Sequence, residues 1–387
     1  MIKINYPHSS VDEKNKFEKD YISHLVTNEM KSEFKKFLKD DIFIKSDIKC
    51  LNDLLLAPFE ELLKIYNIYM DEYPFIEGKK KRNREEYDGK KYELFFNYDK
   101  DKIDKKKPTI TKKQKKISNF FKKYSKKLNL KTCYFCNIDY INTFDNRGEY
   151  DCYLKFLNTA HKNELTQINQ ITDEDAERIV KERDNGEIKD IKQLGFSSNP
   201  AKVRNIEKLV FKEKIVNHYT LDHFLPKSDC PLLALSLYNF VPSCYSCNSS
   251  FKNSKILPKE YLSPTSQKFS VDKNIKFKLF FANKINKNNI LLSIQHDKKY
   301  MDYLDTFKLK GRYSFHKDEA LTLIEKQEKY SETRLNEIAK ILEISPSQVK
   351  KDIFGKELFS GYLQDKSFTK MKRDVARNIG IRGVKDD

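Results

Sequence analysis

Residues 12–72 alternate apolar and polar positions with the period of an α-helix. In the segment DYISHLVTNEMKSEFKKFLK the apolar positions recur at helical spacing, at Tyr21, Leu25, Met30, Phe34 and Phe37. The pattern continues through LNDLLLAPFEELLKIYNIYMDEY, where Pro58 interrupts it because proline lacks the N–H that a helix interior requires. We therefore predict a helical N-terminal domain over residues 1–104. No pattern within it indicates a chemistry.

Residues 105–132 form a basic segment that is predicted to be an amphipathic helix. Between Lys105 and Lys127 there are eleven lysines and no acidic residue, interleaved with Ile117, Phe120, Phe121 and Tyr124. The basic face is either a solvated helix surface or a contact surface for phosphates. Because the segment runs directly into a pair of cysteines, we favour a nucleic-acid contact, with candidate residues Lys112, Lys113 and Lys116.

Residues 266–387 are predicted to combine a strand pair with helices. The stretch KFKLFFANKINKNNILLSIQ has the character of two strands around an Asn-rich turn, and residues 316–355 return to helical spacing. The end of the chain, FTKMKRDVARNIGIRG, is expected to be a short basic tail. A metal knuckle followed by a strand is expected over 133–147, and a returning strand over 215–225. The fold class is therefore α+β, mainly helical.

Charge and composition suggest a polyanionic partner. The formal net charge is +18, and 34% of the residues are charged. A surplus of lysine and arginine favours nucleic acid, since neutralised phosphates release condensed counterions, although a lysine-rich proteome would give the same charge. No signal-peptide core and no apolar run of about 18 residues is present, so we expect a cytoplasmic protein with no membrane partner.

Two C-x-x-C pairs predict a structural zinc site. Cys133 and Cys136 form one pair, Cys244 and Cys247 form the other, and 107 residues separate the two pairs. Each pair has the spacing at which a tight turn brings two thiolates to one tetrahedral ion, and four sulfur ligands leave no open position for catalysis. The other cysteines, at positions 50, 152 and 230, have no partner spacing and are expected to be ordinary buried residues.

A candidate catalytic set lies in the segment HYTLDHFLPKSDCPLLALSLYNFVPSCYSCNSSFKNSK. Asp222 and Asn248 offer hard oxygen ligands to Mg²⁺ or Mn²⁺. His223 is a candidate general base because its unperturbed pKa lies near working pH, and the amide of Asn239 can hold its orientation. Phosphodiester hydrolysis needs this combination of an activated water and a metal ion.

Two lysines follow Asn248 at helical spacing. Lys252 and Lys255 lie four and seven residues after it, so on one helix all three would share a face. We therefore expect both lysines to point at the phosphates beside the metal.

The strings D-H-x-x-P-K-S, N-F-V-P-x-C and C-x-x-C-N-x-x-x-K resemble the ββα-metal signature of HNH endonucleases that carry a four-cysteine zinc site. The resemblance covers about 133–147 and 215–260 and implies a nuclease core over 133–265. It implies that Asp222 and Asn248 are metal ligands, that His223 is the general base and that Asn239 is the central asparagine. The third position is Asn248 where some members carry histidine. Lys227, within the first string, joins the candidate phosphate contacts.

An insertion, residues 150–213, resembles the tandem helix-hairpin-helix module of competence proteins. The matching features are L-N-T-A, E-L-x-x-I and A-x-x-I-x-x-x-R. That family holds a DNA phosphate on a Gly-Ile-Gly hairpin, whereas here the hairpins read Gln170-Ile171-Thr172 and Gly195-Phe196-Ser197-Ser198. A packing or partner-docking role therefore stands beside DNA binding.

The leading functional expectation is a metal-dependent endonuclease, acting most simply on DNA. The alternative is a zinc-stabilised nucleic-acid-binding subunit that does not cut and works in a complex with an ATPase. The signature also resembles nuclease subunits of bacterial anti-phage systems, which implies an antiviral defence role. The chain has no G-x-x-x-x-G-K-[ST] motif, so nucleotide gating would have to come from another chain.

Overall fold

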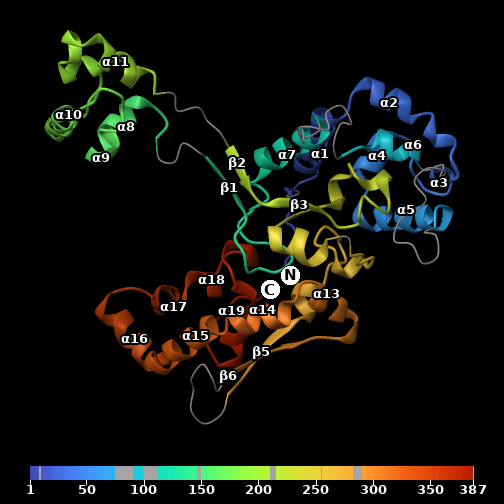
Figure 1. Cartoon of the computed structure of the whole chain (residues 1–387). Coiled ribbons are helices and arrows are strands. Elements are labelled where there is room, and N and C mark those ends of the chain that lie inside the picture. The colour runs from blue at the N-terminus through green and yellow to red at the C-terminus, as the bar shows by residue number, and fades with distance from the viewer. Residues whose placement is uncertain are drawn as a thin grey trace. The chain divides into compact units, whose positions relative to one another are not determined.

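The computed structural model describes residues 1–7, 10–74, 90–98, 112–145, 150–209, 215–253, 255–281 and 290–386. It divides into two compact units (Figure 1). One comprises Met1–Asn142 with His218–Asp387, and the other comprises Thr143–Asn217. The division differs from the predicted segments, since the N-terminal, basic, cysteine-bearing and C-terminal parts share the first unit. The class is the predicted one, mainly helical with small antiparallel sheets.

The N-terminal region is helical, as its periodicity predicts. Its helices are α1 (Val11–Leu25), α2 (Asn28–Phe34), η1 (Phe37–Lys39), α3 (Asp41–Ile44), α4 (Leu51–Leu56), α5 (Phe59–Glu72) and α6 (Lys90–Phe95). Pro58 caps the start of α5 in an extended conformation, which accounts for the predicted interruption.

The basic segment contains α7 (Lys112–Tyr124), and residues 105–111 lie outside the described residues. Its apolar face packs on α1, with the ring of Phe120 centred 4.9 Å from that of Tyr21 and the ring of Tyr124 4.8 Å from that of Phe17. The predicted amphipathic helix is therefore present, with its aromatic stripe in the core.

Two short strand pairs lie between the two cysteine pairs in the sequence. Strand β1 (Asn142–Asp145) pairs with β2 (Ile215–His218), and β3 (Thr220–His223) pairs antiparallel with β4 (Phe240–Ser243). The strand predicted over 215–225 is therefore broken at Tyr219 into two that pair with different partners. Short helices η4 (Pro231–Leu233) and η5 (Leu237–Asn239) lie in the β3–β4 connection, and η6 (Ser246–Lys252) follows β4.

The C-terminal region begins with η7 (Glu260–Leu262), α12 (Val271–Asn274) and the predicted strand pair. Strands β5 (Lys276–Phe281) and β6 (Ile290–Gln295) are antiparallel, and the residues between them lie outside the described part. Helices follow: η8 (Lys298–Tyr300), α13 (Met301–Thr306), α14 (Leu309–Phe315), α15 (Asp318–Lys329), α16 (Glu332–Ile341), α17 (Pro346–Phe354), α18 (Lys356–Phe359) and η9 (Leu363–Asp365).

The expected basic tail is instead a buried helix, α19 (Thr369–Asn378). Lys370 is fully buried and its Nζ donates to both oxygens of Asp374, at 2.9 and 2.8 Å. Asp374 also accepts from the backbone N–H of Phe277 on β5, at 3.0 Å. The prediction was wrong because these basic residues find partners in the fold rather than solvent.

The second unit is a small helical body with its own core. It contains α8 (Tyr153–Thr159), α9 (Lys162–Leu165), α10 (Asp173–Asn185), η2 (Ile191–Leu194), η3 (Phe196–Ser198) and α11 (Pro200–Glu207). The buried residues are Leu157, Ala160, Leu165, Ile168, Ile171, Ala176, Ile179, Ile188, Ile191, Leu194, Phe196 and Ile206. Among the helices of the described residues, none has both the length and the apolar character needed to cross a bilayer.

Candidate metal centre and candidate active site

The first cysteine pair lies in a tight turn between α7 and β1. The backbone N–H of Asn137 donates to the carbonyl of Cys133 at 2.8 Å, and Asn137 adopts a φ of +54°. The N–H of Ile138 donates to Sγ of Cys136 at 3.4 Å. This turn presents both sulfurs on one side, as the C-x-x-C spacing requires.

The second pair follows β4, and the fold brings it onto the first. The N–H of Cys244 donates to Sγ of Cys133, and the N–H of Cys247 donates to Sγ of Cys244, both at 3.4 Å. All four sulfurs, of Cys133, Cys136, Cys244 and Cys247, are buried and lie within 4.8 Å of one another. The four cysteines can hold a metal ion such as zinc, because four soft ligands with N–H donors around them suit a tetrahedral site. The predicted cysteine cluster is thus confirmed.

Arg312, on α14, is a further residue of the metal centre that the sequence did not indicate. Its Nη1 donates to Sγ of Cys247 at 3.3 Å, and its Nη2 donates to Sγ of Cys136 at 3.5 Å. Nη2 also donates to Oδ2 of Asp139 at 2.9 Å. One guanidinium therefore bridges a sulfur of each pair and offsets part of the negative charge that four thiolates and a zinc ion would carry. Arg312 is 176 residues from Cys136 in sequence, so no spacing signal could have identified it.

Asn137 ties the first turn to the C-terminal region. Its side chain is fully buried, and Nδ2 donates to the carbonyls of Leu363 and Lys366, both at 3.1 Å, and to Oγ1 of Thr132 at 2.9 Å. Its Oδ1 accepts from the N–H of Lys370 at 3.1 Å. The asparagine after Cys136 thus links the metal centre to η9 and α19.

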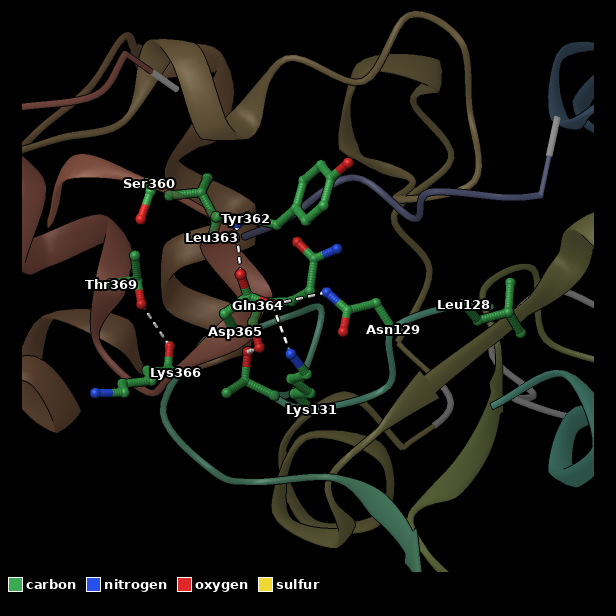
Figure 2. Close-up of polar contacts among 12 residues, drawn as sticks. Leu128, Asn129, Lys131, Ser360, Tyr362, Leu363, Gln364, Asp365, Lys366 and Thr369 are labelled. Carbon is green, nitrogen blue, oxygen red and sulfur yellow. Dashed lines mark hydrogen bonds and ion pairs between the residues drawn. The ribbon is translucent and has the colours of Figure 1, made fainter. Parts of the chain in front are cut away.

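A second link lies beside it. Figure 2 shows the side chains of Asn129 and Lys131 directed at Asp365, whose Oδ1 accepts from both at 2.9 Å. The N–H of Tyr362 donates to the other oxygen of Asp365 at 2.6 Å. These contacts and those of Asn137 hold the cysteine-bearing loop to residues some 230 positions later in the chain.

The candidate catalytic pair lies at the end of β3. In the register of β3 with β4, Asp222 is opposite Val241 and His223 is opposite Phe240. Strand β3 also packs against η6, the helix that follows β4.

Asp222 is buried in an ion pair. Its side chain is 3% exposed, and Nζ of Lys252, itself fully buried, lies 3.0 Å from Oδ2 and 3.3 Å from Oδ1. Nζ also donates to the carbonyl of His223 at 2.9 Å. Burial raises the pKa of Asp222 to about 6, and the charge of Lys252 opposes that rise.

His223 is held by its Nε2, which lies 2.9 Å from the carbonyl oxygen of Ala234. Because a carbonyl only accepts, Nε2 carries the hydrogen, and in the neutral ring the lone pair is on Nδ1. The ring packs edge-to-face on Tyr98 at 4.7 Å and tilted on Phe240 at 4.8 Å. The fold therefore fixes both the plane and the tautomer of this histidine.

Asn239 acts on the loop that carries Ala234. Its Nδ2 donates to the carbonyls of Leu225 and Leu233, at 3.0 and 3.1 Å, and its Oδ1 accepts from the N–H of Leu225 at 2.8 Å. These bonds close the β3–β4 connection. The predicted orienting role is thus indirect, since the amide positions the backbone that accepts from His223 rather than the ring itself.

The N-terminal helices support the same connection. Tyr21 of α1 donates through its hydroxyl to the carbonyl of Leu235 at 2.6 Å, and Ser236 donates through Oγ to the carbonyl of Leu54 of α4 at 3.0 Å. The N-terminal region therefore positions the loop that anchors the candidate base.

The segment after Asn248 differs from its expectation. It forms a π-helix, Ser246–Lys252, that ends where Asn253 takes a φ of +47°. Asn248 is half-buried on this helix, and Lys255 is exposed beyond its end. The predicted shared face was wrong, because the helix has π winding and stops before Lys255. The phosphate role expected of Lys252 was also wrong, because Asp222 and the β3 backbone take its ammonium group into the interior.

The other predicted phosphate contacts lie in varied settings. Nζ of Lys227 lies 5.1 Å from the centre of the Tyr98 ring, the same ring that packs on His223. On α7, Lys116 is half-buried and Lys113 donates to the carbonyl of Phe95. The side chain of Lys112 lies outside the described residues.

Two turns of the insertion each contain a residue with a left-handed backbone. Gln170 has a φ of +68° and is followed by helix α10. Gly195 has a φ of +65° and is followed by η3 and α11. Nζ of Lys202 is paired with the buried carboxylate of Asp175, at 2.5 Å. This lysine therefore supports the packing of α10 and α11.

Two of the remaining cysteines were wrongly expected to be buried. Cys50 and Cys152 are exposed at the N-caps of α4 and α8, and Cys230 is buried as expected.

Comparison of the chain with protein-family models, with curated proteins and with solved structures finds no match.

Proposed function

We propose that this chain is a metal-dependent endonuclease of the HNH type that hydrolyses phosphodiester bonds of DNA. The observation that carries the proposal is the setting of His223. Its Nε2 is committed to the Ala234 carbonyl, which leaves the lone pair on Nδ1, and the adjacent residue is the buried carboxylate of Asp222. A neutral histidine of fixed tautomer is the form that a general base requires.

In the proposed reaction, Nδ1 of His223 takes a proton from a water molecule as that water attacks phosphorus and the bond to the leaving oxygen breaks. When bound, Mg²⁺ or Mn²⁺ would neutralise charge on the scissile phosphate. Asp222 and Asn248 would hold it. The carboxylate of Asp222 supplies hard oxygen ligands, which a metal ion would share with the ammonium group of Lys252, 3.0 Å from Oδ2.

The proposed support for this site has two parts. The four-cysteine centre, loaded with zinc, would join β4 and η6 to the loop before β1 and so hold the strand–strand–helix arrangement. The lysines of α7, with Lys227 and Lys255, would contact the phosphate backbone on either side of the scissile bond. Both parts act through binding and position, and neither enters the bond-breaking step.

A direct test compares cleavage of labelled duplex DNA, single-stranded DNA and RNA by the wild-type chain and by His223→Ala. We expect cleavage with Mg²⁺ or Mn²⁺ and a loss of about 10²- to 10⁴-fold in the variant, the usual contribution of a general base. His296→Ala, in the loop after β6, is the matched control and should keep full activity. Cleavage that persists in a folded His223→Ala chain would refute the assignment of the base.

The second candidate is a zinc-stabilised nucleic-acid-binding subunit that does not cut. The observation that favours it is the ion pair of Lys252 with Asp222, because a buried ammonium group competes with a divalent ion for the carboxylate. Binding of DNA without cleavage under any divalent metal would support this candidate.

A partner ATPase and an anti-phage role are proposed by resemblance alone. The chain lacks a phosphate-binding G-x-x-x-x-G-K-[ST] loop, so a nucleotide-dependent step would require another chain. Constitutive cutting by the purified chain, with no ATPase copurifying from its native host, would count against this role.

A further inference from the structure

Helices α16 and α17 are joined by a tight turn that has a defined form. Only Leu342–Ser345 separate them. The N–H of Ile344 donates to the carbonyl of Ala339 at 3.1 Å, that of Glu343 donates to Lys340 at 3.4 Å, and Glu343 has a φ of +53°. These are the two bonds of a Schellman motif, with Glu343 in the left-handed position that glycine usually occupies.

The next helix starts at once. Ser345 is the N-cap of α17, its Oγ accepts from the N–H of Gln348 at 3.1 Å, and Pro346 takes the first helical position. A short turn with one left-handed residue, followed directly by a capped helix, is the connection found in a helix-turn-helix.

A third helix completes the group (Figure 1). Helix α17 packs against both α15 and α16, and the buried positions between them are Leu323, Leu335, Ala339, Val349 and Phe354. Ala339, three residues before the Leu342–Ser345 connection, is one of these buried positions. Packing against α15 and α16 therefore fixes the position of α17 on this part of the protein.

The outer face of α17 has the chemistry of a DNA-reading helix. From Ile344 to Lys351 the only charged residues are two lysines, and Ser347 and Gln348 are exposed. Nε2 of Gln348 donates to Oδ1 of the exposed Asp352 at 2.7 Å, and on binding the amide would exchange this partner for an adenine edge. Lys351 can donate to guanine. At nine residues α17 is about 13 Å long, which suits a major groove about 12 Å wide.

We infer that α15, α16 and α17 form a helix-turn-helix that binds duplex DNA, with the first turns of α17 in the major groove. Lys340 flanks the reading face, and Lys350 joins α17 to α16 through an ion pair with Glu332 at 2.8 Å. The exposed Ile344, at the turn, can contact thymine methyl groups. The inference goes beyond the proposed nuclease because it concerns recognition and holds whether or not the chain cuts. It would supply the sequence preference that a site acting on the phosphate backbone lacks.

The test uses the full zinc-loaded chain without added magnesium or manganese. Repeated selection from a random duplex library should enrich a short sequence, and fluorescence anisotropy should then show tighter binding to it than to a scrambled duplex. We expect Gln348→Ala to weaken binding to the enriched duplex about 5- to 150-fold, while binding to the scrambled duplex stays within about twofold. Lys351→Ala should also reduce the salt dependence of binding, by about one phosphate contact. Lys31→Ala, an exposed lysine of α2, is the matched control.

The inference is overturned if no sequence is enriched, or if Gln348→Ala and Lys351→Ala bind both duplexes as the wild type does. It is also overturned if Leu342→Ser, in the exposed turn, changes the sedimenting mass of the chain without any change in DNA binding, because the surface is then a protein interface. His223→Ala should keep full sequence-specific binding. A loss of cleavage with binding kept therefore concerns the nuclease proposal, and a loss of specificity with cleavage kept concerns this one.

Discussion

Replacement of Lys252 by methionine should destabilise the protein strongly and in a manner that depends on pH. Lys252 and Asp222 are 0% and 3% exposed, and the ammonium group lies within 3.3 Å of both carboxylate oxygens. Methionine fills a similar volume but carries no charge, so the carboxylate would remain buried without a counterion. Loss of one partner of a buried ion pair costs about 3–5 kcal/mol of unfolding free energy.

The pKa of Asp222 supplies the sign of the pH effect. Burial raises it from the usual 3.8 to about 6 even beside Lys252, a rise that corresponds to about 3 kcal/mol. Because the folded state holds this proton more tightly than the unfolded state, the contribution of Asp222 to stability is greatest below pH 4 and falls as pH rises towards 6. Without Lys252 the pKa should rise further, so the fall continues above pH 6. Above pH 6 the free energy of unfolding of the variant therefore falls by about 1.4 kcal/mol per pH unit relative to the wild type, until the pH passes the pKa of Asp222 in the variant.

Urea denaturation at pH 6 and pH 8.5, without added magnesium or manganese, measures the effect. The loss caused by Lys252→Met should be clearly larger at pH 8.5, and the double variant Lys252→Met/Asp222→Asn should recover about 3 kcal/mol of it there. A loss that is equal at the two pH values, and unchanged in the double variant, would show that packing rather than charge controls this site and would refute the reasoning.

Three further predictions concern the metal centre and the turns. Arg312→Met removes both N–H···S bonds and should speed the transfer of zinc from the protein to a colorimetric chelator by about 10- to 100-fold. Cys244→Ser is the positive control. An unchanged transfer rate in Arg312→Met would contradict the bridging role. Asn137→Ala should lower the free energy of unfolding by about 2–4 kcal/mol in urea denaturation, because it removes buried hydrogen bonds and places alanine at a φ of +54°. Asn137→Gly also removes these bonds but tolerates that φ, so its loss should be smaller. Equal losses in the two variants would exclude a backbone contribution. Glu343→Gly should raise stability by about 0.5–1 kcal/mol in a thermal melt, since it relieves a left-handed glutamate, and a lower melting temperature would contradict that account.

Local sequence patterns predicted much of the secondary structure. The helical spacing at 12–72 and 316–355 gave the correct class because each amphipathic helix records its own buried face. The same reasoning failed at α19, whose basic residues looked solvated. Lys370 pairs with Asp374 one turn along the same helix, and the burial of this pair is a matter of tertiary packing, because the backbone of β5 donates to Asp374.

In the candidate site, too, some features follow from local sequence spacing and others depend on tertiary packing. The spacing within each C-x-x-C pair is a local requirement of tetrahedral coordination, and the fold brings the two pairs together as expected. The tautomer of His223 depends on the carbonyl of Ala234, which a closed loop and the N-terminal helices hold in place. No pattern near His223 specifies that partner.

By itself, the sequence determined the helical class, the amphipathic basic helix, the four cysteines that can hold a metal ion and the adjacency of Asp222 and His223. Only the tertiary structure decided that Lys252 turns inward to Asp222, that Arg312 reaches both cysteine pairs and that α15, α16 and α17 form one group. The physical reason is range. Periodicity and ligand spacing act over a few residues, whereas the partner of a buried charge is chosen by the whole fold, because leaving that charge unpaired costs several kcal/mol.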